Sequence, residues 1–357
     1  KEVSYMISIV TLDKTEKWNH IVKSFKNYDI YYLSNYVKAF KIHGDGEPLL
    51  FFYEDENMSA INIVMKRDIG TDERFATEIP PNTFYDIATP YGYGGFLIEG
   101  NITDHSLQAL NDKYSSLCST EGIISEIVRF HPVLNNSEDV KELYDVCKLG
   151  KTITLTLSSK DDIWHNLNTN KKRWIKKTIE SGVEVCQGRS QELFSEFRLM
   201  YNDTMKKNKA KDYYFFNDDF YQSVLNDMAD YSSIFYAVYE SEIIGMVLVV
   251  YGNEQIHHHL SASVMEFQHL APTNLLMYEI ACWGNENGFN TFHQGGGVGS
   301  REDNLYEFKK GFNKNSDTTF SIGKKIFNEE TYHYLMEIRK RINNFDDSTP
   351  FFPQYRA

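Results

Sequence analysis

The chain is short of cysteine, proline and long apolar runs. Its 357 residues include eight prolines and four cysteines, which are scattered with no Cys-x-x-Cys spacing. This pattern argues against a zinc site or a disulfide framework and predicts reduced thiols in a cytoplasmic protein. No apolar run approaches the roughly 20 residues that a membrane span requires, so we expect no integral membrane segment. The N-terminus also lacks the pattern of a secretory signal peptide.

Positive charge is scarce as well. The 37 Lys and Arg residues are outnumbered by 50 Asp and Glu residues, which gives a net charge of -13. This balance disfavours DNA binding and broad binding to other nucleic acids or to anionic membranes, although a local basic patch remains compatible with it. The length and the 41% hydrophobic content are typical of a globular protein with two domains.

Two segments share one pattern. Residues 48–66 and 233–251 each consist of an aromatic and β-branched run, a short acidic turn and a second β-rich run, which predicts a β-hairpin. Helical patterns precede the hairpins at 18–40, 191–207 and 218–230, and a helix and a strand follow them at 104–117 and 122–130, and at 272–287 and 289–293. We therefore predict an α/β protein of two related halves. They comprise residues 1–150 and 151–357, the second with a basic linker helix and the C-terminal helix.

The linker helix concentrates positive charge. Five cations fall within residues 171–177, after a helix start for which Ser159 is a suitable cap. A solvated helix face would explain such a run. In an acidic protein, however, the run equally predicts an anion-binding surface, for which we select Lys172 and Arg173. The planar guanidinium of Arg173 suits bidentate contact with phosphate.

A glycine-rich segment follows the last predicted strand. Gly295, Gly296 and Gly297 precede the pair Phe308-Lys309. Glycines let the backbone approach a ligand, although a tight strand-to-helix turn explains them equally well. Lys309 is a candidate for neutralising charge at the same place, and a surface lysine is the alternative. Asp303 is expected to cap the helix that follows.

The first half has a loop of similar composition and two flanking carboxylates. Tyr91 and Tyr93 alternate with glycines in residues 91–95, and they could contact substrate. Asp86 and Glu99 flank the loop. Each could act as a general base or be a turn or cap carboxylate.

Three consecutive histidines occupy a predicted strand at 257–259. Alternation along a strand places only His257 and His259 on one face. No cysteine or carboxylate is placed with them by spacing, so we predict no metal site.

Four segments in order resemble one family. Residues 173–185, 90–95, 270–278 and 295–312 are similar to the Fem-type peptidoglycan aminoacyltransferases and related acetyltransferases of the GNAT superfamily, over roughly residues 29–320. The resemblance implies two tandem GNAT-like half-domains. Each would have a mixed, mostly antiparallel sheet flanked by helices.

The resemblance also implies an activity. It is acyl or aminoacyl transfer to an amino group of a cell-envelope or glycan precursor, with no covalent enzyme intermediate and no permanently bound cofactor. Lys309, beside Phe308, would stabilise the reacting carbonyl, with Asp86 as a candidate base. Lys172 and Arg173 would hold the phosphate of a lipid- or nucleotide-linked acceptor.

The donor stays open. The chain lacks the long helical arm that some Fem-type enzymes associate with tRNA binding. The acyl-CoA pyrophosphate turn, Gln/Arg-x-x-Gly-x-Gly/Ala, has its nearest counterpart in residues 268–273, where the glycine is missing. Aminoacyl-tRNA, acyl-CoA and acyl carrier protein are therefore alternatives, as is a noncatalytic binding protein of the same fold.

Overall fold

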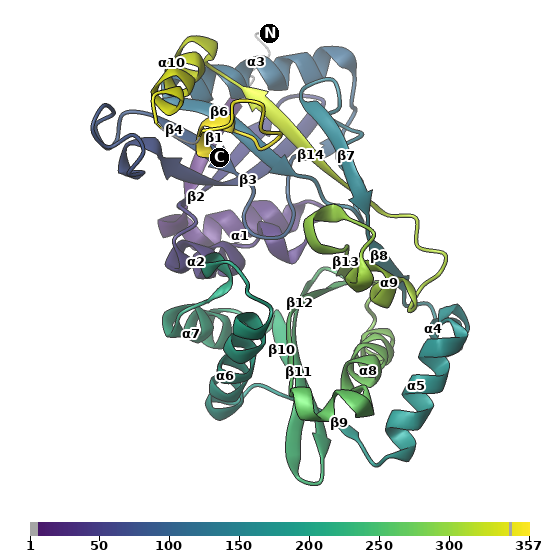
Figure 1. Ribbon diagram of the computed structural model, residues 1–357. Helices are drawn as coiled ribbons and strands as arrows, with labels where there is room; N and C mark the ends of the chain where they lie inside the picture. The colour runs from purple at the N-terminus through teal and green to yellow at the C-terminus, as the bar shows by residue number, and fades with distance from the viewer. Residues whose placement is uncertain (1–5, 343–344) are drawn as a thin grey trace. The chain divides into compact units, whose positions relative to one another are not determined.

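The computed structural model describes residues 6–342 and 345–357, which belong to two compact units (Figure 1). One unit combines Lys1–Leu149 with Phe320–Ala357, and the other is Gly150–Thr319. The sequence prediction assigned everything after residue 150 to the second half. Residues from 320 onward belong instead to the first unit, because β14 (Thr319–Ile326) pairs antiparallel with β6 (Ile123–Arg129) of that unit.

The first unit is built on a sheet with the strand order β1-β2-β3-β4-β6-β14-β7, and β5 also pairs with β3. The predicted hairpin at 48–66 is confirmed as the antiparallel pair β2–β3. The predicted helix at 18–40 is in fact two helices, α1 and α2, separated by a turn. The remaining bounds are β1 (Met6–Thr11), β2 (Glu47–Glu54), β3 (Met58–Asp68), β4 (Tyr85–Ala88), β5 (Leu97–Gly100), β7 (Asp145–Lys151), α1 (Thr15–Ser24), α2 (Ser34–His43), α3 (Asp104–Thr120) and α10 (Glu329–Lys340).

The second unit has a sheet with the order β8-β13-β12-β11-β10-β9. Helix α8 lies on one side of this sheet and α6 and α7 on the other (Figure 1). The bounds are β8 (Ile153–Thr156), β9 (Glu184–Gly188), β10 (Ser232–Tyr239), β11 (Glu242–Gly252), β12 (Gln255–Ser263), β13 (Thr291–Gly295), α4 (Lys160–Asn166), α5 (Thr169–Glu180), α6 (Gln191–Lys207), α7 (Asp218–Asp227), α8 (Pro272–Glu286) and α9 (Asn304–Lys310). Across the described ranges, no helix is long and apolar enough to cross a membrane.

The two units repeat one arrangement of strands. In the first, β3 and β4 are antiparallel, and α3 connects onward to β6, which lies parallel to β4. In the second, β11 and β12 are antiparallel, and α8 connects β12 to the parallel strand β13. The prediction of two related α/β halves is therefore confirmed. The two units can therefore be compared at their parallel strand pairs, β4–β6 in the first unit and β12–β13 in the second.

Candidate active site

The parallel strands of the second unit separate after a short contact. They pair only at Gln255↔Thr291, Ile256↔Phe292 and His257↔His293. Beyond this point each strand carries a bulge. His259 is the extra residue of β12 against β11, and Gln294 is the extra residue of β13 against β8. We call residues 257–260 and 293–297 the fork. Bulges redirect side chains and are common beside active sites, so strict alternation does not decide the face of His259.

Two side chains at the fork have buried polar atoms without a hydrogen bond, Gln294 and the half-buried His258. Gln294 is 1% exposed, and neither Oε1 nor Nε2 has a hydrogen-bond partner among the described residues. Nε2 of His258 is unpartnered in the same sense. Burial and then the nearby charge of Lys309 lower the pKa of His258 to about 3, so its ring is neutral at physiological pH. Because buried polar groups are almost always hydrogen-bonded, this local concentration marks the fork as a candidate ligand site.

Lys309 brings a buried amine to the fork. Its Nζ donates a 2.7 Å hydrogen bond to the carbonyl oxygen of Gly296, and the residue is 8% exposed. Burial lowers the pKa of Lys309 to about 8, while the carboxylate of Asp303 acts in the opposite direction. At neutral pH the group is therefore mainly an ammonium in a water-poor place. Such a cation can stabilise an oxygen that gains negative charge.

The glycine-rich loop is held by its own chain. Asp303 caps α9 as predicted, since its side chain accepts 3.0 Å hydrogen bonds from the N–H groups of Tyr306 and Val298. A Cβ at Gly297 would collide with the Asp303 carboxylate, and a Cβ at Gly296 would lie 2.9 Å from the Lys151 carbonyl oxygen. These glycines are needed for the fold of the loop. Substrate contact by Gly295, Gly296 and Gly297 remains a prediction.

A second buried lysine packs behind α9. Lys171 is 7% exposed, and its Nζ donates a 2.7 Å hydrogen bond to Oδ1 of Asn274. The amine lies 3.3 Å from the ring centroid of Phe308 and 4.3 Å from that of Phe312. Burial lowers the pKa of Lys171 to about 7. Lys171 thus fixes the residue directly before Lys309.

Lys171 and Gln294 were not predicted from the sequence as site residues. For Lys171 a signal existed, because it shares helical spacing with the buried residues Ile175 and Thr178. No pattern marked Gln294, because its burial depends on a bulge between β13 and β8.

Lys172 and Arg173 are adjacent residues of α5. Lys172 donates a 3.3 Å hydrogen bond to the backbone carbonyl of His165. Arg173 is exposed, and its guanidinium lies 5.8 Å from the ring of Trp174. Neither cation has a carboxylate partner in the part of the chain that the structure describes, so both can bind an anion.

In the first unit, the position that corresponds to the fork is filled by the chain. The Arg129 guanidinium donates to the carbonyls of Thr89, Pro90 and Gly92 at 2.7, 2.7 and 3.1 Å. Gly94 forms a parallel bridge with Phe130 at the end of β6. The loop that contains Tyr91 and Tyr93 therefore closes the gap beside β6.

The two tyrosines of this loop are packed and half-buried. Tyr91 stacks on Phe40 with ring centroids 5.3 Å apart, and Tyr93 meets Tyr31 edge to face at 5.7 Å. Gly92 is required here, because it has a φ of 95° and a Cβ would collide with the Tyr31 ring. Contact of Tyr91 and Tyr93 with substrate stays a prediction.

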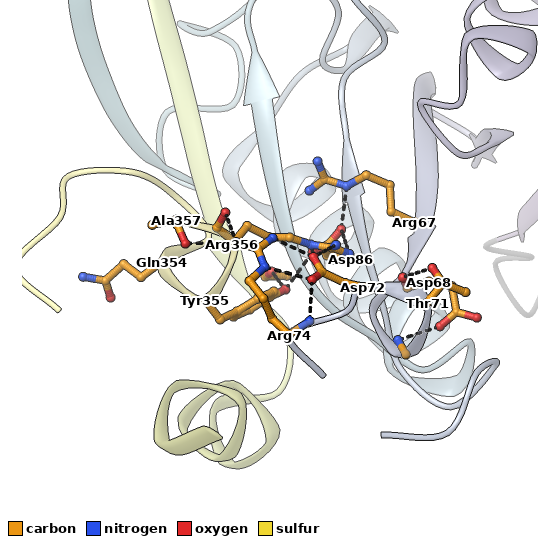
Figure 2. A network of polar contacts seen from close by, with 12 residues as sticks. Arg67, Asp68, Thr71, Asp72, Arg74, Asp86, Gln354, Tyr355, Arg356 and Ala357 are labelled. Atoms are coloured by element: carbon orange, nitrogen blue, oxygen red, sulfur yellow. Dashed lines mark hydrogen bonds and ion pairs between the residues drawn. The ribbon is translucent and has the colours of Figure 1, made fainter. Parts of the chain in front are cut away.

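The two candidate base carboxylates are engaged in structural contacts. Asp86 is fully buried and accepts hydrogen bonds from Nε of Arg67 at 2.7 Å and Nε of Arg356 at 2.8 Å (Figure 2). Burial raises the pKa of Asp86, but the two guanidinium groups outweigh it and hold the pKa below its usual range. A base for an amine works best with a pKa near the operating pH, so this environment favours a structural role. Glu99 accepts a hydrogen bond from the backbone N–H of Lys26.

The fold and the fork define the class of protein. Residues 168–310 match the acetyltransferase (GNAT) domain family, and this range lies within the second unit and contains α5, the fork and α9. The prediction of a GNAT-type acyltransferase domain is thereby confirmed for the second unit. A comparison with curated protein sequences found no match.

Solved structures extend the likeness to both units. FemX shares 12% sequence identity with this chain at a TM-score of 0.66, covering 92% of this chain and 99% of FemX. The C-terminal domain of a putative lysylphosphatidylglycerol synthetase from Agrobacterium fabrum shares 12% identity at a TM-score of 0.56, covering 92% and 95%. A tandem GNAT protein from the clavulanic acid biosynthesis pathway shares 6% identity at a TM-score of 0.51, covering 91% and 99%. At these identities the likeness establishes a common tandem fold.

Proposed function

We propose that this protein transfers an acyl or aminoacyl group to an amino group of a cell-envelope or glycan precursor in the cytoplasm. One observation carries the proposal: the buried ammonium of Lys309 lies at a fork where Gln294 and Nε2 of His258 have no hydrogen-bond partner among the described residues, inside the GNAT domain. In the reaction the amine nitrogen bonds to the carbonyl carbon, and the ester or thioester bond of the donor breaks. The leaving group and the amine proton depart.

Lys309 would stabilise the carbonyl oxygen as it gains charge. Removal of one such donor from an oxyanion site typically costs about 10²–10³ in kcat. Phe308 and the loop glycines would shape the site beside it. Lys172 and Arg173 would hold an acceptor phosphate, because neither cation has a carboxylate partner among the described residues.

Direct attack is favoured over a covalent enzyme intermediate. A cysteine nucleophile acts as the thiolate, and burial raises the pKa of both Cys118 and Cys282. These two thiols are therefore protonated and buried at neutral pH.

The backbone before α8 favours aminoacyl-tRNA over acyl-CoA as donor. Ala271 has a φ of 52°, and its N–H donates to the carbonyl of Gln268. Pro272 has no N–H, and the N–H of Asn274 donates to the carbonyl of Ala271. A pyrophosphate would thus find few backbone donors at this turn. Transfer from acyl-CoA or an acyl carrier protein to an amino sugar is the second candidate, supported by the acetyltransferase domain match.

The test presents charged tRNA and acetyl-CoA, separately, with a nucleotide-linked muramyl peptide and with glucosamine. We expect turnover with charged tRNA that RNase abolishes, and loss of that turnover in Lys309→Met. Lys310→Met is the matched control, because Lys310 is adjacent but half-exposed and contacts Glu307 at 3.7 Å. Turnover with acetyl-CoA alone would select the second candidate. If neither donor is used, the noncatalytic alternative is favoured. If Lys309→Met turns over substrate as fast as the wild type, Lys309 has no part in the mechanism.

A further inference from the structure

We propose that the exposed side of α5 binds the surface of an anionic membrane. It combines four cations with two large apolar side chains. We call this set the α5 face: Lys172, Arg173, Lys176, Lys177, Trp174 and Ile179. The partner is a bilayer that contains acidic phospholipid. The proposal concerns binding, so it does not depend on the proposed reaction.

The four cations lie together on the side of α5 that faces away from the core. The buried side is formed by Lys171, Ile175 and Thr178. With 3.6 residues per turn, the cations cover roughly 140° of the opposite side. In the part of the chain that the structure describes, none of them pairs with a carboxylate, whereas other surface cations do, as Lys160 does with Glu286. The α5 face thus holds uncompensated positive charge in an acidic protein.

Tryptophan rings lie among these cations. Trp174 is half-buried, and its ring centroid lies 5.8 Å from the guanidinium carbon of Arg173 and 5.0 Å from Nζ of Lys177. Nζ of Lys176 lies 5.8 Å from the centroid of the half-buried Trp164 ring on α4. Tryptophan is enriched at the level of lipid headgroups, where long cationic side chains extend along apolar surface toward phosphate. This combination is typical of a helix that lies in a membrane interface.

Ile179 favours a bilayer over a nucleic acid as the partner. Its side chain is 52% exposed, and helical spacing places it on the flank of Lys172 and Lys176. A nucleic acid offers phosphates and base faces, which cations and aromatic rings bind, but an aliphatic chain gains little from either. At a membrane the same chain enters the boundary between headgroups and acyl chains. The 12 residues of α5 extend about 18 Å, so all four cations can meet one flat surface.

Opposing charge limits the strength of this contact. The chain carries a net charge of -13, and Glu180 is exposed at the C-terminal end of α5. Attraction between exposed charges extends only about 8 Å at physiological ionic strength. We therefore expect reversible binding that requires acidic lipid and weakens as salt is added.

Docking would also select the form of the acceptor. It would hold Lys172 and Arg173 at the level of the headgroups, where a lipid-linked acceptor carries its phosphate. This step rests on the proposed function, under which those two residues bind that phosphate. Lys176 and Lys177 would contact only the bilayer, so their removal should not affect transfer to a soluble, nucleotide-linked acceptor.

The test measures co-sedimentation of the full chain with vesicles of phosphatidylglycerol and phosphatidylcholine in equal parts, and with vesicles of phosphatidylcholine alone. We expect binding to the mixed vesicles, little binding to the neutral ones, and loss of binding at high salt. Lys176→Gln/Lys177→Gln should weaken binding at least 10-fold, because each cation near an anionic surface contributes roughly fivefold. Lys206→Gln/Lys207→Gln removes the same charge from exposed positions at the end of α6 and should bind like the wild type. Both pairs are exposed, so neither change should lower the melting temperature.

A second measurement reports insertion instead of charge. Lipids brominated on their acyl chains quench tryptophan fluorescence at short range, so mixed vesicles that contain them should quench the fluorescence of the wild type. Trp174→Phe should reduce this quenching. Trp283→Phe is the control and should not reduce it, because the Trp283 ring packs against Phe235 and Phe289 with centroids 5.3 and 5.4 Å apart.

The proposal is overturned if mixed and neutral vesicles bind the chain equally, or if Lys176→Gln/Lys177→Gln binds mixed vesicles as the wild type does. If this variant instead loses binding to deacylated tRNA, and the wild type does not bind vesicles, the α5 face is a surface for RNA. Vesicle binding without turnover of any donor would reject the proposed reaction alone, whereas turnover without vesicle binding would reject this proposal alone.

Discussion

The amine of Lys171 lies 3.3 Å from the centroid of the Phe308 ring. Phe308 directly precedes Lys309, whose amine reaches the fork. This contact joins α5 to α9 through the Lys171 amine, and burying that amine in its charged form costs free energy of folding. Its ordinary pKa of 10.5 falls to about 7 in the folded protein. The unfolded chain therefore binds more protons than the folded one between about pH 7 and pH 10.5, and stability contributed at this site rises with pH across that window.

Lys171→Met should raise the melting temperature by a few degrees at pH 6, and the gain should shrink by pH 10. The reason is that methionine removes the cost of burying a charged amine, and this cost disappears as the wild-type amine loses its proton. Thermal denaturation at several pH values measures it. Lys176→Met, on the exposed side of the same helix, should change the melting temperature little at any pH. If the gain in melting temperature does not depend on pH, the pKa of Lys171 is not lowered by burial.

Activity should decline as the pH rises through about 8. Lys309 must be protonated to stabilise a developing oxyanion, and its pKa is lowered to about 8. Lys309→Arg should keep part of the activity and move this alkaline decline to higher pH, since arginine stays charged. A pH profile of kcat for both proteins decides the matter. An unchanged alkaline limb in the arginine variant would assign it to another group.

Arg173→Ala should raise the acceptor KM about 10-fold and leave kcat within about twofold. The guanidinium would bind phosphate equally in the ground state and in the transition state, and uniform binding of this kind appears in KM. Steady-state kinetics with a phosphorylated acceptor provide the measurement. Lys177→Ala is the control from the same helix. A loss confined to kcat would place Arg173 at the reacting centre.

Asp86→Asn should destabilise the first unit and spare the chemistry. Removal of one partner of a buried ion pair typically costs about 3–5 kcal/mol, and here two guanidinium groups would lose their counter-charge. Because the folded-state pKa of Asp86 is depressed, its contribution is present above the usual aspartate pKa and is lost as the pH falls through the folded value. Chemical denaturation should show the loss, whereas Asp145→Asn, at an exposed site, should not. A collapse of kcat at unchanged stability would restore the general-base hypothesis.

Local patterns predicted much of this fold. The hairpins, the helix over Pro272–Glu286 and the cap by Asp303 all depend on residues close in sequence, and the structure confirms them. The pairing of β14 with β6 was not predictable in this way, because its hydrogen bonds join segments that are far apart in the chain. No local sequence pattern indicated that β14 belongs to the first sheet.

The site was partly predictable for the same reason. Lys309 was singled out because glycines and an aromatic residue precede it. Lys171 and Lys172 are adjacent lysines. Apart from the helical spacing that Lys171 shares with Ile175 and Thr178, their difference in burial depends on the packing of α5 against other parts of the unit. The bulge at His259 likewise depends on the register of β12 against β11, so simple alternation does not decide the face of that residue.

The path of the chain has a consequence for synthesis. Phe320–Ala357 completes a unit whose other part is Lys1–Leu149, and the residues in between form the GNAT-bearing unit. On the ribosome, the GNAT-bearing unit can therefore finish folding before β14 of the first unit has been synthesised. The edge of β6 in the first sheet stays open until β14 emerges.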